Sequence, residues 1–249
     1  MKKLILLPVL FVSLLSVSCS DDDNKTPENP GAPVSSQVVA ATGFNYKEFY
    51  LEEALPENRK GIVILAVGDG ADENDGTLND QCVALAQNGY VAITTDFVEL
   101  SDATLTQINQ KFQANIEEVI LKTTTTHAIP RSKVIIGGLS RGGNNVFALV
   151  LPGQMGVDPI VGIKAVILQC SGGDNWKGSA IKYPVAYMST LNDNEMNSNA
   201  NEFKAGLQAN MNPGVADSSE CLIIPGTGHC TELSRYKPFI VQKVVQWLP

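Results

Sequence analysis

The sequence predicts an α/β domain whose mainly parallel sheet is covered by helices on both faces. Two observations lead to this prediction. Short, continuous apolar runs recur along the chain, as in strands buried on both faces, and segments with apolar residues at helical spacing separate them. Strands that alternate with helices are typical of parallel sheets. The chain has 249 residues, 44% of them hydrophobic, which suffices for one well-filled domain.

The first 18 residues are interpreted as a signal peptide. Lys2 and Lys3 precede an apolar run over residues 4–17, which is too short to span a bilayer comfortably. The run leads to Cys19 and resembles a bacterial lipobox, although Ser16 stands where a leucine is usual. The resemblance implies that Cys19 is lipidated, with plain secretion after cleavage near Cys19 as the alternative. We therefore expect an exported lipoprotein of the outer membrane or cell surface, with a periplasmic or secreted protein as the fallback.

Residues 19–37 are polar and rich in proline, and they are interpreted as a disordered tether. The acidic residues 21–23 resemble a signal that sends some Gram-negative lipoproteins to the outer surface, and a solvated tail is an equal alternative. The net charge is −8 and no basic cluster is present, which disfavours nucleic acid and anionic membrane surfaces as partners. We expect membrane contact only through the lipid anchor.

The folded domain is expected over residues 38–249. Residues 44–51 read as one or two early strands. Further strands are expected at residues 61–68, 91–96, 134–136, 163–168, 184–188 and 221–225. Helices are expected at residues 78–86 and 105–120, after residue 140 as far as Pro152, at 203–211, and from near Pro238 to the end, where Val241, Val244, Val245 and Leu248 form the buried face.

A glycine-bounded serine follows the strand at residues 134–136. Residues 138–142, Gly-Leu-Ser-Arg-Gly, fit the G-x-S-x-G nucleophile elbow, a tight turn from a strand into a helix. The glycines are needed because side chains at their positions would clash with a neighbouring strand or helix. A turn with a capping serine is the alternative, and the strand before and helix after favour the elbow. Ser140 is then a nucleophile, and the backbone N–H of Arg141 faces an oxyanion.

A serine nucleophile needs a base, and the chain has two histidines. His229 lies in a glycine-rich loop between the last strand and the final helix, where a base is expected; a loop histidine that caps the helix is the alternative. His127 lies at the end of the long helix whose apolar face is formed within residues 105–120, and it is interpreted as a surface or capping histidine.

The carboxylate that orients the base should follow the strand at residues 184–188. Asp193 is our choice, with Glu195 as its rival and Asp174 third. A solvated acidic turn is the alternative interpretation of this segment. The order Ser140, Asp193, His229 agrees with the order imposed by the sheet in which nucleophile elbows occur.

From about residue 60 to its end, the chain resembles a small α/β-hydrolase of the dienelactone-hydrolase and esterase type. The resemblance is carried by residues 85–96, 129–143, 190–193 and 228–229. It implies an α/β-hydrolase fold, no cofactor, and Ser140, Asp193 and His229 as nucleophile, acid and base. It also implies a second oxyanion N–H in the loop after the strand at residues 61–68, at Asp69.

One feature of this chain departs from the family pattern, and a second feature narrows the type of site that is expected. Many members carry His-Gly or Pro-Gly where this chain has residues 67–70, Val-Gly-Asp-Gly, and the Asp69 carboxylate must point away from a developing oxyanion. Only about a dozen residues separate the strands at 163–168 and 184–188, so no cap domain is expected. An open, shallow site would suit short acyl esters or esters on a polymer, and Trp176 either stacks on substrate there or packs beneath the loop.

No pattern indicates a bound metal. The acidic loop at residues 69–76 lacks the EF-hand spacing and its closing glutamate, so a solvated loop is favoured. No C-x-x-C or His-rich spacing exists, which argues against structural zinc. Four cysteines besides Cys19 allow up to two disulfides in an exported chain, and the spacing leaves the pairing open: Cys82, Cys170, Cys221 and Cys230.

The sequence therefore predicts an exported serine hydrolase that cleaves carboxylic esters through an acyl-enzyme on Ser140. A peptidase is disfavoured because no propeller or cap domain is present to sort peptides. The alternative is a weak or inactive hydrolase-like surface protein that binds a glycan or a partner, and Asp69 is the feature in its favour.

Overall fold

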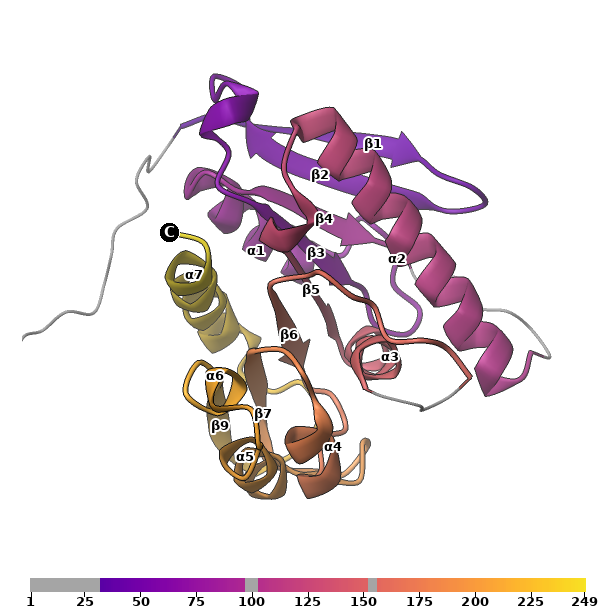
Figure 1. The fold of residues 1–249 in the computed structure, drawn as a ribbon, viewed down its shortest axis with the longest axis vertical. Helices are drawn as coiled ribbons and strands as arrows, with labels where there is room; N and C mark the ends of the chain where they lie inside the picture. Colours follow the sequence, from indigo (N-terminus) through magenta and orange to yellow (C-terminus); the bar gives the residue numbers. More distant parts are fainter. Residues whose placement is uncertain (1–31, 97–102, 152–155) are drawn as a thin grey trace, which may run out of the picture.

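A computed structural model describes residues 32–96, 103–151 and 156–249 (Figure 1). The expected signal peptide, Cys19 and most of the tether lie outside these residues. The described strands form one sheet in the order β1-β2-β4-β3-β5-β6-β7-β8, and β9 pairs with β7. The strands are β1 (Val34–Ala40), β2 (Asn45–Leu51), β3 (Ile62–Ala66), β4 (Val91–Thr95), β5 (Val134–Leu139), β6 (Ala165–Gln169), β7 (Val185–Asp193), β8 (Ser198–Asn199) and β9 (Glu220–Thr227).

The sheet is mainly parallel, as the sequence predicts. The pairs β4–β3, β3–β5, β5–β6, β6–β7 and β7–β9 are parallel. The outer strands β1, β2 and β8 pair antiparallel. The carboxyl ends of the parallel strands therefore meet at one edge of the sheet, and the loops that follow them lie side by side there.

Helices cover both faces of the sheet. The helices α1 (Gly76–Gln87) and α7 (Tyr236–Trp247) lie on one face, and α2 (Leu105–His127) and α3 (Arg141–Val150) lie on the other (Figure 1). The shorter α4 (Asn175–Ala180), α5 (Ala200–Gln208) and α6 (Pro213–Ala216) gather beside β7 and β9. The chain passes from β3 to α1 and from neighbouring β5 to α3, which lie on opposite faces. The carboxyl ends of β3 and β5 are therefore a point at which the chain leaves the sheet toward opposite faces, the position at which open α/β sheets bind ligands.

Polar residues define where the first two helices begin. The Asp75 carboxylate accepts the Leu78 N–H at 2.8 Å and caps α1. Thr104 and Gln107 form a capping box at the start of α2. Such caps satisfy backbone donors that have no partner within the helix. The acidic loop at residues 69–76 thus contributes a helix cap.

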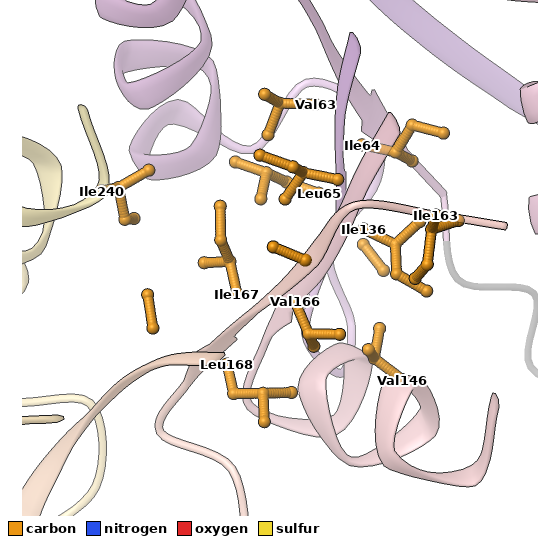
Figure 2. Close-up of a cluster of buried hydrophobic side chains, with 14 of the residues drawn as sticks. Val63, Ile64, Leu65, Ile136, Val146, Ile163, Val166, Ile167, Leu168 and Ile240 are labelled. Atoms are coloured by element: carbon orange, nitrogen blue, oxygen red, sulfur yellow. The ribbon is translucent and has the colours of Figure 1, made fainter. Parts of the chain in front are cut away.

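The hydrophobic core lies on both faces of the sheet, as continuous apolar strands require. Val63, Leu65 and Ile167 point toward the side on which Ile240 of α7 lies, and Ile64 and Val166 point toward the side of α3 (Figure 2). These side chains are at most 1% exposed. Successive strand residues alternate between the faces, so each apolar run fills two core layers.

The observed elements differ from the predicted ones in a few places. Strand β1 begins at Val34, so residues 34–37 belong to the sheet and not to the predicted tether, and the domain begins before the predicted residue 38. Antiparallel pairing with β2 uses backbone groups and tolerates the exposed polar side chains there. Helix α7 begins at Tyr236 and its buried face is rotated, so Val241 and Val245 are only half-buried. Helix α3 ends at Val150, and the predicted stop at Pro152 lies outside the described residues.

The segment between β6 and β7 is short. Residues 170–184, which join β6 to β7, carry only the six-residue helix α4, so no cap domain covers this edge. Among the described residues, none of the helices has the length and apolar character needed to cross a membrane.

Candidate active site

Ser140 stands at the turn between β5 and α3. Its backbone has φ +55° and ψ −120°, a strained conformation for a residue with a side chain. The Ser140 N–H donates to the carbonyl of Gln169 at the end of β6, at 2.8 Å. Its side chain makes no helix-capping bond. The alternative of a capping serine is therefore wrong, and the hydroxyl is free to act on another group.

The glycines of the elbow allow close backbone packing. A Cβ on Gly138 would lie 2.5 Å from the Gly142 carbonyl carbon, and a Cβ on Gly142 would lie 2.3 Å from the Val67 oxygen. Carbon atoms at these separations overlap, so a side chain at either position would force the turn apart. The elbow thus depends on both glycines.

His229 reaches Ser140 from the loop after β9. Its Nε2 lies 2.7 Å from Ser140 Oγ, and its Nδ1 lies 2.7 Å from Asp193 Oδ2. A carboxylate only accepts, so the His229 Nδ1 carries a proton and the Nε2 accepts the Ser140 hydroxyl. The His229 side chain is 12% exposed, so the ring is shielded and still accessible from outside.

Asp193 is the last residue of β7 and is buried, with a 0% exposed side chain. Its Oδ1 accepts the backbone N–H groups of Glu195 and Met196, each at 3.1 Å, while its Oδ2 faces His229. Three donors thereby occupy three of the four lone-pair directions of the carboxylate and hold it in one orientation. The rival Glu195 contributes its backbone only, and Asp174 caps α4 through Lys177 N at 2.8 Å.

The loop after β3 lies against the nucleophile. A Cβ on Gly68 would lie 3.4 Å from Ser140 Cβ, so residues 67–69 border the space above the serine. The Asp69 carboxylate binds the Arg141 guanidinium, with Oδ1 and Nη1 2.7 Å apart. The side chains are 55% and 35% exposed. The negative charge that the sequence places beside the oxyanion position is thus paired with a positive one.

Trp176 lies at the edge of a pocket beside Ser140, Asp193 and His229. The pocket has a volume of about 270 Å³, and Trp176 is 44% exposed. Its lining also includes Asn144, Phe147, Lys177 and Met196, and it includes none of Ser140, Asp193 and His229. Trp176 therefore does not pack beneath its loop, and its ring borders a hollow one helical turn from the serine.

His127 is buried, at 2% exposure, so its interpretation as a surface or capping histidine is wrong. Its Nε2 lies 3.5 Å from Glu48 Oε2, its Nδ1 contacts Arg59, and the Tyr50 ring lies 5.7 Å away. These partners come from β2 and the segment after it, which pack on the end of α2. Because Glu48, Tyr50 and Arg59 are distant from His127 in the sequence, the residues around His127 give no local sign of a buried cluster.

Burial raises the pKa of Glu48, but the hydrogen bond from Gln37 and the neighbouring His127 and Arg59 outweigh it. The pKa of Glu48 therefore lies below its ordinary value. The cluster joins the end of α2 to β2 and shares no residue with the site at Ser140.

One disulfide pairs Cys170 with Cys230, a pairing that the sequence left open. Cys82 is buried and Cys221 half-buried, and both are free thiols. Burial raises the pKa of the Cys221 thiol to about 12, which keeps it protonated and unreactive. The disulfide is part of the site, because Cys230 directly follows His229. The spacing of the cysteines alone does not show that Cys170 is its partner.

Within the described part of the chain, no group of three or more His, Cys, Asp or Glu side chains is arranged to hold a metal ion. The three residues brought together at the sheet edge are a hydroxyl, an imidazole and a carboxylate. Such a set can move a proton from a hydroxyl to an imidazole and so activate the oxygen as a nucleophile.

No protein-family model and no curated protein matches the sequence. Solved structures resemble the fold. A dienelactone hydrolase-like protein of Klebsiella pneumoniae has a TM-score of 0.59 at 14% identity, covering 87% of this chain and 98% of its own. Esterase 2 of Thermogutta terrifontis has a TM-score of 0.61 at 15% identity, covering 90% and 98%.

A feruloyl esterase module of Clostridium thermocellum, solved as a mutant in complex with sinapinate, has a TM-score of 0.60 at 14% identity. The match covers 87% of this chain and 88% of the module. The shared architecture extends over nearly all of the domain in each comparison. This chain therefore has the α/β-hydrolase fold, and the residues that the structure describes include no cap domain.

Proposed function

We propose that the protein is an exported serine hydrolase that cleaves carboxylic esters, with Ser140 as nucleophile, His229 as base and Asp193 as acid. The observation that carries the proposal is the continuous chain from Ser140 Oγ to His229 Nε2 and from His229 Nδ1 to Asp193 Oδ2, with both distances 2.7 Å. Distances in this range allow proton transfer without rearrangement.

The reaction follows from this geometry. Ser140 Oγ attacks the ester carbonyl carbon while His229 Nε2 takes the hydroxyl proton, and the buried Asp193 carboxylate stabilises the resulting imidazolium. The carbonyl oxygen becomes an oxyanion that faces the backbone N–H groups of Arg141 and Asp69. His229 then gives its proton to the departing alcohol. A water molecule, deprotonated by His229, hydrolyses the acyl-enzyme.

Known proteins of the same fold support this chemistry. Esterase 2 of Thermogutta terrifontis has been solved in a form phosphonylated by sarin, at 14% identity to this chain, and reaction with an organophosphonate is a property of activated serines. The two other neighbours are named for dienelactone and feruloyl ester hydrolysis. The substrates proposed here are esters of small molecules or esters on a polymer.

The pocket at Trp176 is proposed to hold the part of the substrate that extends beyond the ester. Asn144 and Ala148 line it and lie four and eight residues after Ser140 on α3, so they are about 6 and 12 Å along the helix axis from the serine. Trp176 offers a ring for stacking, and Phe147 contributes to the apolar wall. A short acyl ester would leave this pocket empty.

The test is labelling of the purified protein with a fluorophosphonate, followed by peptide mapping and by assay of chromogenic esters. We expect one adduct, on Ser140, which Ser140→Ala abolishes and His229→Ala strongly reduces. Folded protein that takes no adduct and cleaves no ester would contradict the proposal. That result would favour the second candidate, a hydrolase-like binding protein, for which the Asp69 charge beside the serine is the motivating observation.

Export and lipidation are proposed from the first 19 residues. The Cys170–Cys230 disulfide supports export, because disulfides persist in oxidising compartments. We expect the protein in the outer-membrane fraction of a Gram-negative host, with its amino terminus acylated at Cys19, and Cys19→Ser in the soluble periplasmic or secreted fraction. An unaltered distribution of the variant would contradict lipidation.

A further inference from the structure

The disulfide joins two segments that hold the proposed nucleophile and base. Cys170 is the first residue after β6 and is fully buried. The residue before it, Gln169, accepts the backbone N–H of Ser140 at 2.8 Å. Cys230 directly follows His229 and lies 5.2 Å from Cys170, Cα to Cα. The strand end that holds the serine backbone is therefore covalently tied to the loop of the histidine.

The loop of His229 has an unfavourable backbone. Gly226, Gly228, Cys230 and Glu232 have φ values of +110°, +125°, +49° and +54°. Two of these residues carry side chains, for which such φ values cost free energy and persist only where the surroundings impose them. A loop of this kind would relax to other conformations if its anchors were released.

Two anchors flank the histidine. On one side, the Thr190 hydroxyl donates to the Gly228 carbonyl. On the other side stands the disulfide, whose Cys170 end is fixed because the Cys170 N–H donates to Met188 O of β7 at 2.7 Å. The Tyr236 hydroxyl, at the start of α7, lies 3.7 Å from Cys170 Sγ. His229 is thus held between a hydrogen bond and a covalent bond, whose other ends, Thr190 and Cys170, are fixed to β7.

We propose that the Cys170–Cys230 disulfide is a positioning element that holds His229 against Ser140, so that its reduction lowers turnover while the domain stays folded. This inference rests on the proposed hydrolase function. Reduction takes two equivalents of a small thiol. The first attacks the half-buried Cys230 sulfur, and the Cys170 sulfur leaves as a thiolate and takes a proton. The second attacks the mixed disulfide, releasing the Cys230 thiol and the oxidised reagent.

Loss of the bond removes one of the two anchors and leaves Thr190 and Asp193 to hold the histidine. The ring then samples positions farther from Ser140 Oγ, and misplacement of a catalytic group by about 1 Å costs on the order of 100-fold in rate. We expect kcat to fall between tenfold and 100-fold, with KM changed less than twofold, because His229 acts in the chemical step and is not part of the pocket lining.

The experiment uses the mature protein, oxidised or treated with dithiothreitol, beside the double variant Cys170→Ala/Cys230→Ala. Measured are kcat and KM for an acetyl ester, folding by near-ultraviolet circular dichroism, and the downfield proton resonance of His229 Nδ1–H. The free-thiol variant Cys221→Ala is the matched control and should behave as the wild type. Reoxidation should restore kcat in the wild type and not in the double variant.

Unchanged kcat in the reduced protein would overturn the proposal. So would a loss of kcat that only follows the loss of folded protein. If the folded, oxidised protein cleaves no ester and takes no fluorophosphonate, the hydrolase function fails instead. The positioning role is then decided by the His229 resonance, which we expect in the oxidised protein and not in the reduced one.

Discussion

The Asp69 carboxylate and the Arg141 guanidinium lie 2.7 Å apart, Oδ1 to Nη1, so the two residues proposed to supply the oxyanion N–H groups are also joined through their side chains. The pair joins the loop after β3 to the start of α3. It binds one wall of the proposed oxyanion site to the other, and it neutralises a carboxylate that would otherwise oppose the charge formed in the reaction.

We predict that Asp69→Asn raises kcat/KM about twofold to fivefold for a neutral ester. The substitution removes a negative charge beside the proposed oxyanion position and keeps the positive charge of Arg141, a change worth about 1 kcal/mol in a solvated site. The gain should shrink at high salt, since the pair is half exposed. Asp72→Asn, which removes a charge from the same loop outside the pair, is the control, and an equal gain there would contradict a local effect.

Replacing each of the two histidines by alanine should affect a different property, kcat for His229 and stability for His127. We predict that His229→Ala lowers kcat at least 1,000-fold with little effect on stability, because the base is lost. His127→Ala should reduce the free energy of unfolding by about 1–3 kcal/mol, because it removes a partner of the buried Glu48 and of the half-buried Arg59. Denaturant titration and ester assays below the unfolding temperature separate the two. A large loss of kcat in folded His127→Ala would contradict this division.

Glu48 should make the protein less stable in acid. Its pKa is lower in the folded state than in the unfolded chain, where it is near the ordinary 4.5. The stabilisation is therefore present above about pH 4.5 and is lost as the pH falls through the lower, folded pKa, because the unfolded chain binds the proton first.

Glu48→Gln tests this dependence. The variant should be less stable than the wild type at neutral pH, and the difference should narrow below pH 4.5. Urea unfolding at a series of pH values measures it. A difference that stays constant with pH would show that the Glu48 charge does not contribute.

Trp176 should affect extended substrates only. We predict that Trp176→Ala raises KM about threefold to tenfold for an aryl or long-chain acyl ester, a loss of about 1 kcal/mol of stacking and apolar contact, and leaves KM for an acetyl ester unchanged. Met211→Ala is the control, because Met211 is 97% exposed and is not part of the pocket lining. Equal effects on both esters would place the pocket outside the substrate path.

The sequence predicts the architecture well because its signals are local. The apolar runs at residues 61–68, 91–96 and 163–168 each contain enough information to identify a buried strand, and alternation with helices implies parallel pairing. The elbow is equally local, since Gly138 and Gly142 are both required within five residues. The gathering of Ser140, Asp193 and His229 then follows from strand order.

Contacts between distant segments could not be predicted in the same way. The burial of His127 depends on Glu48 and Arg59, which lie 79 and 68 residues earlier and reach it only through the packing of β2 on α2. The disulfide depends on how β6, β7 and β9 lie side by side, and four cysteines offer no spacing that selects one pairing. The ion pair of Asp69 with Arg141 could not be predicted either, because the two residues are distant in the sequence.

The position of His229 near the end of the chain has a consequence for synthesis. Strands β3, β5 and β6, which support Ser140, are complete by residue 169, whereas the base arrives only with the loop after β9. Helix α7 follows it and is fixed when the Tyr90 hydroxyl donates to the Leu248 carbonyl at 2.6 Å. A nascent chain leaving the ribosome therefore carries the proposed nucleophile before the proposed base, and the contact between Ser140 and His229 forms only after β9 and its loop have folded against β7.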